Sequence, residues 1–246
     1  AAEPLTEAEK HEFDKVKQRV EKLCKKAVET DRKLMLDAED SWIQQVMDDL
    51  ILDMMRKYNT EKPIIYNTFQ MYRHDRLALL KKWHDIAERE GFYIGVKVVR
   101  GAYMEKERKR AKEMGYLDPI QPDKASSDRD YNAAMEFITS HIDRFGLCAG
   151  THNEQSSMLI TKLMQEKNIP SNTPQIYFSQ LLGMSDHISF NLAHAGYNVA
   201  KYVPYGPVKE VLPYLIRRAE ENTSVAGQTS RELDLLTREV SRRKGR

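Results

Sequence analysis

The sequence predicts an α/β fold of the (βα)8 TIM-barrel type that lacks its most N-terminal strand or strands. Short apolar runs alternate with helical patterns along the chain, which is typical of βα units that build a parallel sheet. Most of these runs end in a reactive or small residue, and functional groups at the carboxyl ends of many strands are characteristic of a barrel. About six strands can be recognised, whereas a closed barrel needs roughly eight.

The elements follow one another without a break. Charged residues with helical periodicity predict a first helix over about 6–30. The predicted strands lie at 33–36, 63–66, 93–99, 147–150, 175–178 and 198–202. The predicted helices lie near 41–57, 75–90, 127–145, 154–167, 185–195 and 208–222. Since no linker rich in Gly, Ser or Pro interrupts the chain, we expect one domain over 1–246, with an N-terminal helix at 1–32, βα units at 33–225 and a C-terminal helix or basic tail at 226–246.

Composition narrows the class of protein. The 246 residues are 41% hydrophobic and 31% charged, which suits one soluble, barrel-sized domain with a real core. A net charge of +2 gives no reason to expect a nucleic-acid partner. No apolar run approaches the length of a membrane span, and the N-terminus lacks the apolar stretch of a signal peptide. The basic C-terminal end reads as a solvated tail, with weak attraction to anionic lipid as the alternative.

Three further absences narrow the class of protein. Neither GxGxxG nor GxxxxGK[ST] occurs, which disfavours an open dinucleotide-binding sheet. Cys24 and Cys148 form no metal or redox motif, and two thiols in a chain of this length suggest a reducing compartment. The histidines show no tight ligand spacing, so no metal site is expected.

The most informative segment is KYVPYGPVKEVLPYLIRRAEEN at 201–222. Four residues of its predicted helix share one face because they are spaced i, i+3, i+4 and i+7: Tyr214, Arg217, Arg218 and Glu221. Adjacent arginines one turn after an aromatic residue form a clamp that suits a carboxylate or phosphate. A solvated arginine face on a surface helix is the alternative.

This segment resembles the C-terminal signature of the proline dehydrogenase family, FAD enzymes that oxidise L-proline. Further segments match in the same order: LMLDAED (34–40), NTFQMYR (67–73), VKVVRGAYMEKER (96–108), THNEQS (151–156) and QLLGM (180–184). The series covers roughly residues 1–225 and is closer to the animal-type branch than to the large bacterial bifunctional enzymes. The family pattern also places a strand with a substrate-binding lysine upstream of anything in this sequence, which implies an incomplete barrel.

The resemblance implies a substrate pocket of cations and aromatic walls. Arg217 and Arg218 are expected to bind the substrate carboxylate, and three tyrosines are expected to line the pocket: Tyr103, Tyr202 and Tyr214. From the residues alone a place in the core is the favoured interpretation of each tyrosine. Because relatives that prefer 4-hydroxyproline have a smaller residue at the position of Tyr202, a tyrosine there favours proline.

Two charged residues are the expected catalytic groups. Asp37 directly follows an apolar run, a position that suits a site residue or a helix N-cap. The resemblance implies an orienting role for Asp37 in the site, with a role as general base left open. Lys97 stands where many relatives have an arginine that donates to flavin N5, so its cation is expected to stabilise the reduced flavin. Taken alone, Lys97 also fits a solvent-facing strand lysine.

The remaining implied residues contact FAD. They are Gln70, Lys97, Arg100, Gly101, Ala102, Thr151, His152, Asn153, Gln180 and Glu221. Glycine lets the backbone approach a ligand closely, and Arg100 can meet the pyrophosphate. The alignment at Gln180 shifts by one place against distant relatives, and Glu221 has pairing with the arginines as an alternative.

The implied reaction is oxidation of L-proline to pyrroline-5-carboxylate, with hydride transfer to FAD and electrons passed on to a quinone. The implied location is the matrix side of the inner mitochondrial membrane, with peripheral membrane association, or the cytoplasm for a bacterial protein. The alternatives are a hydroxyproline-preferring relative, another anion-binding barrel enzyme such as an aldolase or lyase, and a truncated barrel fragment that binds FAD poorly.

Overall fold

The computed structural model describes residues 4–38, 40–224 and 226–244, with the side chains of residues 217–232 and 235 outside the description. Within these ranges six parallel strands form one sheet in the order β1-β2-β3-β4-β5-β6. They are β1 (Leu34–Leu36), β2 (Ile65–Gln70), β3 (Ile94–Val99), β4 (Phe145–Gly150), β5 (Ile176–Leu181) and β6 (Val199–Tyr202). Each strand pairs with the next strand in sequence, as consecutive βα units require.

The sheet curls into a half-barrel. Lys33, just before β1, places its ammonium group 4.5 Å from the ring centroid of Tyr177 on β5. Lys97 on β3 lies 5.8 Å from the ring centroid of Tyr202 on β6. Side chains from strands three or four places apart therefore meet across the concave face. Closure into a (βα)8 barrel needs about eight strands, so the described residues form a curled six-stranded half-barrel and not the full barrel.

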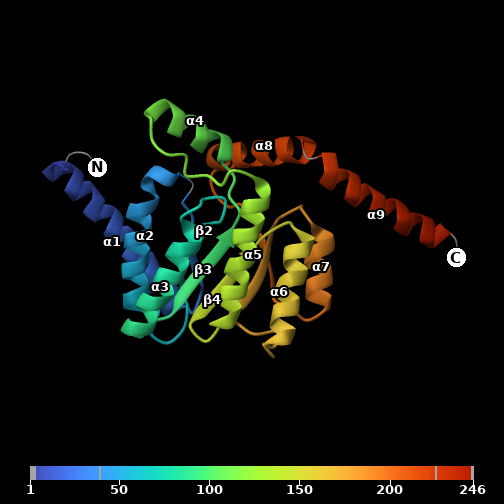
Figure 1. Ribbon diagram of the computed structural model, residues 1–246, viewed down its shortest axis with the longest axis horizontal. Coiled ribbons are helices and arrows are strands. Elements are labelled where there is room, and N and C mark those ends of the chain that lie inside the picture. The colour runs from blue at the N-terminus through green and yellow to red at the C-terminus, as the bar shows by residue number, and fades with distance from the viewer. Residues whose placement is uncertain (1–3, 39, 225, 245–246) are drawn as a thin grey trace.

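Helices surround this sheet (Figure 1). Its convex face is covered by α2 (Ser41–Tyr58), α3 (Arg76–Glu90), α5 (Lys124–Ser140), α6 (Glu154–Glu166) and α7 (Asp186–His194). Helix α1 (Glu7–Glu29) packs beside α2. Helices α4 (Met104–Met114) and α8 (Val208–Ser224) lie over one end of the sheet, and α9 (Ala226–Lys244) extends away from the body. No helix in the described ranges is long and apolar enough to cross a membrane.

The core lies between the sheet and its covering helices. All six residues of β2 are buried, as expected for a parallel strand covered on both faces. Phe69 on β2 meets Trp83 of α3 edge to face, with the ring centroids 5.2 Å apart. Ile51 and Met55 of α2 are completely buried in the same cluster. These apolar contacts hold the strands whose ends carry the functional groups.

A buried ion pair ties α2 and α3 to β2. Both guanidinium nitrogens of Arg76 donate to Asp48 Oδ2, at 2.8 and 2.7 Å, and each of the two side chains is 2% exposed. Asp48 Oδ1 accepts hydrogen bonds from Asn67 of β2 at 2.7 Å and from Gln44 at 2.9 Å. The guanidinium also lies 5.0 Å from the ring centroid of Phe69. Both oxygens of a buried carboxylate are thus hydrogen-bonded, as burial of a charge requires.

The structure corrects the predicted elements in three places. Helix α4 occupies 104–114, where no helix was predicted, because its highly charged sequence hides the apolar periodicity. Helix α5 spans 124–140 instead of 127–145, since Phe145 begins β4. Strands β2 and β5 run on to Gln70 and Leu181, so Gln70 and Gln180 lie within strands and not after them. The division of the chain into a single domain stays a prediction.

Candidate active site

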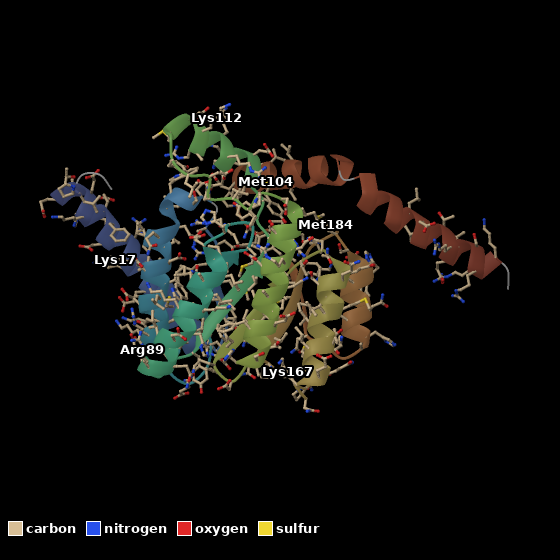
Figure 2. The ribbon with its side chains drawn as sticks, in the orientation of Figure 1. Lys17, Arg89, Met104, Lys112, Lys167 and Met184 are labelled. Carbon is tan, nitrogen blue, oxygen red and sulfur yellow. The ribbon has the colours of Figure 1, made fainter. Side chains whose placement is uncertain are left out.

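A cavity of about 840 Å³ opens at the carboxyl ends of the strands. This is the end of the molecule at which Met104 and Met184 lie in Figure 2, whereas Arg89 and Lys167 lie at the opposite end. Every predicted site residue with a described side chain lines the cavity: Asp37, Gln70, Lys97, Arg100, Gly101, Ala102, Tyr103, Thr151, His152, Asn153, Gln180, Tyr202 and Tyr214. Arg217, Arg218 and Glu221 belong to α8, but their side chains lie outside the described residues.

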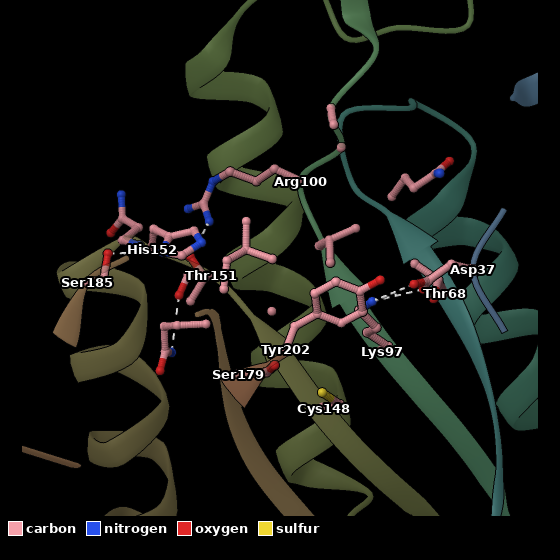
Figure 3. A pocket seen from close by; sticks show the side chains of 18 of the residues that line it. Asp37, Thr68, Lys97, Arg100, Cys148, Thr151, His152, Ser179, Ser185 and Tyr202 are labelled. Carbon is pink, nitrogen blue, oxygen red and sulfur yellow. Dashed lines mark hydrogen bonds and ion pairs between the residues drawn. The ribbon is translucent and has the colours of Figure 1, made fainter. Parts of the chain in front are cut away.

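An ion pair forms one wall of the cavity. Lys97 Nζ lies 2.9 Å from both carboxylate oxygens of Asp37, and Thr68 Oγ1 donates to Asp37 Oδ1 at 2.5 Å. Thr68 and Lys97 are register partners on β2 and β3, so their side chains leave the sheet side by side. The pairing of the strands therefore positions this group, which Figure 3 shows on the right of the cavity.

The contacts of Asp37 separate the two interpretations of its position. Helix α2 begins at Ser41, and the N-cap position is held by Asp40. Asp37 instead points into the cavity, where its side chain is 47% exposed. Asp37 therefore lines the cavity and does not cap α2, and its role in an active site stays a prediction.

Aromatic side chains stand across from this ion pair. Tyr202 is the last residue of β6, and Tyr214 projects from α8 with its ring centroid 5.6 Å from that of Tyr202. The Lys97 ammonium lies 5.8 Å from the Tyr202 ring centroid, a cation–π distance. Figure 3 shows Tyr202 between the Lys97 group and the turn that carries Thr151. Tyr202 and Tyr214, which stand close together in the sequence on β6 and α8, thus form an aromatic pair at the cavity wall.

Arg100 organises the opposite side of the cavity. Its guanidinium donates through Nε to Asp128 at 2.5 Å, through Nη1 to Thr151 Oγ1 at 2.9 Å and through Nη2 to Ser156 Oγ at 2.9 Å. It also lies 4.4 Å from the ring centroid of Tyr131. These contacts hold the turn between β4 and α6 in place. A direct contact of Arg100 with a pyrophosphate stays a prediction.

Lys124 is a further cation at the rim that sequence reasoning missed. It is the first residue of α5, where no motif points to it, and it donates to Asp128 at 2.5 Å. Burial raises the pKa of Asp128, but hydrogen bonds from Lys124 and Arg100 outweigh burial and hold that pKa below its usual value. Asp128 therefore stays ionised at neutral pH and holds two cations at this edge of the cavity.

The Thr-His-Asn turn joins two helices of the site. Asn153 is the N-cap of α6, and its Oδ1 accepts a hydrogen bond from the backbone N–H of Ser156 at 3.0 Å. The Nδ1 of His152 lies 2.9 Å from Ser185 Oγ. Ser185, which precedes α7, has a left-handed backbone with φ of +52°. Sequence reasoning missed Ser185 because its contact with His152 spans 33 residues.

Gly101 lies where no side chain fits. Its φ is +126°, and a Cβ at this position would lie 2.4 Å from Cδ1 of Tyr72. Glycine is the residue that adopts such a backbone without a clash. The main chain between Arg100 and Ala102 therefore lies bare against the cavity, supported from behind by the Tyr72 ring.

The two glutamines brace the wall with their amides. Gln70 Nε2 donates to the backbone carbonyl of Ala38. Gln180 Nε2 donates to the Thr151 carbonyl at 3.3 Å, and its Oε1 accepts from Ser189 at 2.8 Å. A direct contact of either glutamine with FAD stays a prediction.

Cys148 lies on the cavity floor as the register partner of Lys97. Burial raises the pKa of its thiol to about 11, against the opposing effect of the Lys97 charge. The thiol is therefore protonated and a poor nucleophile at neutral pH. Thr68, Cys148 and Lys97 became recognisable as neighbours only through strand register, which the sequence does not provide.

Among the described residues, no group of three or more His, Cys, Asp or Glu side chains is placed to hold a metal ion. The chemistry that this part of the cavity offers is a paired ammonium and carboxylate, hydroxyl and imidazole groups, and aromatic faces.

Comparison with known sequences gives a consistent set of relatives. A family model described as "Proline dehydrogenase" matches residues 2–231. Human "Proline dehydrogenase 1, mitochondrial" is 43% identical over 98% of this chain and 41% of the relative. "Hydroxyproline dehydrogenase" of Xenopus laevis is 40% identical over 97% of this chain and 52% of the relative. The chain therefore spans about two fifths to half of the length of these relatives.

Solved structures share the fold. Proline utilization A from Bdellovibrio bacteriovorus, inactivated by N-propargylglycine, superposes with a TM-score of 0.79 over 87% of this chain and 22% of that chain. A proline utilization A structure from Bradyrhizobium japonicum gives 0.76 over 86% and 22%. Both are 24% identical to this chain, so the likeness concerns the fold.

Proposed function

The chain belongs to the proline dehydrogenase family, and from this premise we propose that it oxidises L-proline to pyrroline-5-carboxylate with hydride transfer to FAD. The observation that carries the proposal is the convergence of the Asp37–Lys97 ion pair, the Tyr202–Tyr214 pair and the bare Gly101 turn on one cavity. Ligand sites combine a few placed polar groups with apolar and aromatic walls in this way.

The residues of the cavity fit FAD. Its volume of about 840 Å³ lies in the upper part of the range for ligand pockets, roughly 300–1,000 Å³. FAD, when bound, supplies the hydride acceptor. We propose that Lys97 faces the flavin ring, that the Gly101 turn supports the cofactor, and that Thr151, His152 and Asn153 contact it. Gln70, Arg100, Ala102, Gln180 and Glu221 are proposed as further FAD contacts.

The proposed substrate site uses the remaining groups. Arg217 and Arg218 bind the proline carboxylate, while Tyr103, Tyr202 and Tyr214 pack against the proline ring. Asp37 orients Lys97 through the ion pair and faces the substrate amine. In this proposal the substrate is held by fixed charges beside aromatic faces.

The electron acceptor and the cellular location of the protein are part of the same proposal. Relatives from human and Caenorhabditis elegans are named mitochondrial, which supports a mitochondrial location for this chain. We propose that electrons leave for a quinone at the matrix side of the inner membrane, with peripheral membrane association. If the source is bacterial, the corresponding location is the cytoplasm.

The proposed function is tested by the visible spectrum of the protein after reconstitution with FAD. We expect a yellow protein whose absorbance near 450 nm is bleached by L-proline without oxygen, and less by trans-4-hydroxyproline; the wavelength is roughly that of any oxidised flavin. Protein that stays colourless with added FAD would favour a fragment that does not hold the cofactor. Faster bleaching by hydroxyproline would favour the second candidate, hydroxyproline oxidation, to which the Xenopus laevis relative points.

Tyr202→Ser is expected to shift substrate preference. Removing the ring frees the space that a ring hydroxyl of the substrate needs, so the ratio of kcat/KM for hydroxyproline to that for proline should rise on the order of tenfold. The matched control is Tyr205→Ser, since Tyr205 is fully exposed. An unchanged ratio in Tyr202→Ser would contradict the specificity role, and an equal shift in both variants would do the same.

Arg217→Ala is expected to raise KM for proline while leaving flavin content unchanged. Loss of one partner of a desolvated charge pair costs at least about 2 kcal/mol, which corresponds to roughly thirtyfold in affinity. Arg238→Ala on α9 is the control, because its side chain is 75% exposed and pairs with Asp234 one turn earlier on the same helix. Loss of flavin with KM unchanged would assign Arg217 to the cofactor.

A further inference from the structure

Glu107 of α4 is a fully buried carboxylate. Its Oε1 accepts the backbone N–H of Ser41 at 2.7 Å, and its Oε2 accepts the Ser41 hydroxyl at 2.5 Å. Ser41 begins α2, and an N–H in that position has no partner within its own helix. The N-cap residue Asp40 makes no side-chain cap hydrogen bond. The first turn of α2 is therefore capped by a side chain 66 residues away.

Further contacts join the same pair of helices, and the two shortest involve Lys106 and Arg110. Lys106 Nζ lies 2.6 Å from Asp40 Oδ1, and the Arg110 guanidinium lies 4.1 Å from the ring centroid of Trp42. With the Ser41–Glu107 bonds these contacts form what we call the α2–α4 clasp. Of its three pairs only the Ser41–Glu107 pair is buried on the α4 side, because Lys106 is 52% exposed.

The clasp connects two loops that the sheet leaves unconnected. Asp37 stands four residues before Ser41, and α4 begins directly after Tyr103. These loops follow β1 and β3, which are separated by β2, so no strand pairing joins their ends. In Figure 1 α4 lies over this end of the sheet. The Asp37–Lys97 ion pair of the site also joins the first of these loops to β3.

The side chain of Tyr72 packs against the Gly101 turn and is also affected by the charge of Glu107. The Tyr72 ring supports Gly101, and burial together with the charge of Glu107 raises the pKa of the Tyr72 hydroxyl to about 12. The carboxylate is thus close enough to Tyr72 to act on its ionisation. Glu107 lies in the first turn of α4, which begins directly after the cavity-lining residues Arg100 to Tyr103.

We propose that Glu107 is a positioning residue of the site: its hydrogen bonds to Ser41 hold the Asp37 loop against the turn that carries Arg100 to Tyr103. Its effect on FAD and proline rests on the proposed function. The coupling of the two loops does not, and it is measurable in protein without cofactor.

Hydrogen–deuterium exchange of the cofactor-free protein tests the coupling. Glu107→Ala leaves the Ser41 N–H without its acceptor, so exchange should accelerate about tenfold in peptides covering 37–46 and in those covering 100–107. Glu107→Gln retains both bonds, since its amide oxygen accepts the N–H and its amide nitrogen donates to the Ser41 hydroxyl. Exchange in Glu107→Gln should therefore stay within about twofold of the parent protein. Glu113→Ala is the matched control, a carboxylate on the same helix that is 61% exposed.

The functional measurement uses FAD titration of the same variants by fluorescence quenching, followed by proline kinetics. Glu107→Ala should weaken FAD binding about tenfold and lower kcat more than it raises KM, while Glu107→Gln and Glu113→Ala stay near the parent. If the parent protein binds no FAD, the proposed function fails, and the exchange result still decides whether Glu107 couples the loops.

Three results for Glu107→Ala would overturn the proposal. Exchange could accelerate in one of the two peptides alone, it could accelerate evenly over the whole sheet, or it could stay unchanged. If Glu107→Ala does not fold, Ser41→Ala serves instead, because it removes the hydroxyl bond and keeps the N–H bond. Ser41→Ala should accelerate exchange in both peptides by a smaller factor, and no acceleration in either would overturn the proposal equally.

Discussion

Lys97→Met is expected to lower the rate constant for flavin reduction by L-proline about 10²–10³-fold. The ammonium group of Lys97 projects into the cavity from β3, where we propose that it faces the flavin ring. A flavin bound there would gain negative charge on reduction, and the fixed cation of Lys97 would stabilise that charge. Methionine retains most of the side-chain volume, so the variant removes the charge and little packing.

The substitution also releases Asp37. In the parent both carboxylate oxygens of Asp37 accept from Lys97, and Oδ1 accepts from Thr68 as well. Among the described hydrogen bonds of this carboxylate, the one from Thr68 remains without the ammonium, so the proposed orientation of Asp37 toward the substrate amine should be lost together with the cation. The two losses act on the same step, and their effects should not be additive.

Anaerobic stopped-flow absorbance at saturating proline measures this rate constant. Lys33→Met is the control, because Lys33 also stands on the concave face of the sheet but at the opposite end, over Tyr177. A Lys97→Met protein that retains its flavin and is reduced within threefold of the parent rate would contradict the catalytic role; threefold is roughly 0.65 kcal/mol. Loss of flavin would instead make Lys97 a residue of cofactor retention.

Arg76→Met is expected to have the largest effect on stability. Its removal leaves Asp48 buried without its cation, which costs about 3–5 kcal/mol. In a chain of this size that corresponds to a fall in Tm of roughly 10 °C. Thermal unfolding followed by circular dichroism measures the difference, and the result does not depend on the proposed function.

Arg56→Met is the matched control. Arg56 pairs with Glu90 at 2.6 Å and Asp53 at 3.0 Å, but its side chain is 37% exposed. Ion pairs in contact with solvent contribute about 0–1 kcal/mol, so this variant should unfold near the parent temperature. Adding Asp48→Leu to Arg76→Met should recover part of the lost stability, because it removes the unpaired charge. Equal shifts in Arg56→Met and Arg76→Met would show that burial does not determine the strength of these pairs.

The site was predictable to the extent that its residues lie in segments that match the family pattern. Asp37, Lys97, Thr151 and Tyr202 were identified from matched segments, and the structure gathers them around one cavity. Thr68 and Cys148 were missed because they become neighbours of Lys97 only through strand register. Lys124 and Ser185 stand at helix starts in segments without a motif.

The burial of Glu107 is the clearest example of a feature that the sequence could not predict. In the sequence this glutamate is one charge among many in a stretch that was not even predicted as a helix, and a surface position was the natural expectation for it. Its burial follows from a partner 66 residues away. The same holds for the Arg76–Asp48 pair, since neither residue stands out in a chain that is 31% charged.

The sequence by itself determined the order of the βα units, the family and most of the residues at the strand ends, because each of these is written in local patterns of a few residues. Only the tertiary structure decided that the six described strands curl into a half-barrel, that Asp37 pairs with Lys97, and that Glu107 joins two loops. The physical reason is that register, curl and the burial of charge depend on contacts between distant segments, whose energies no local pattern records.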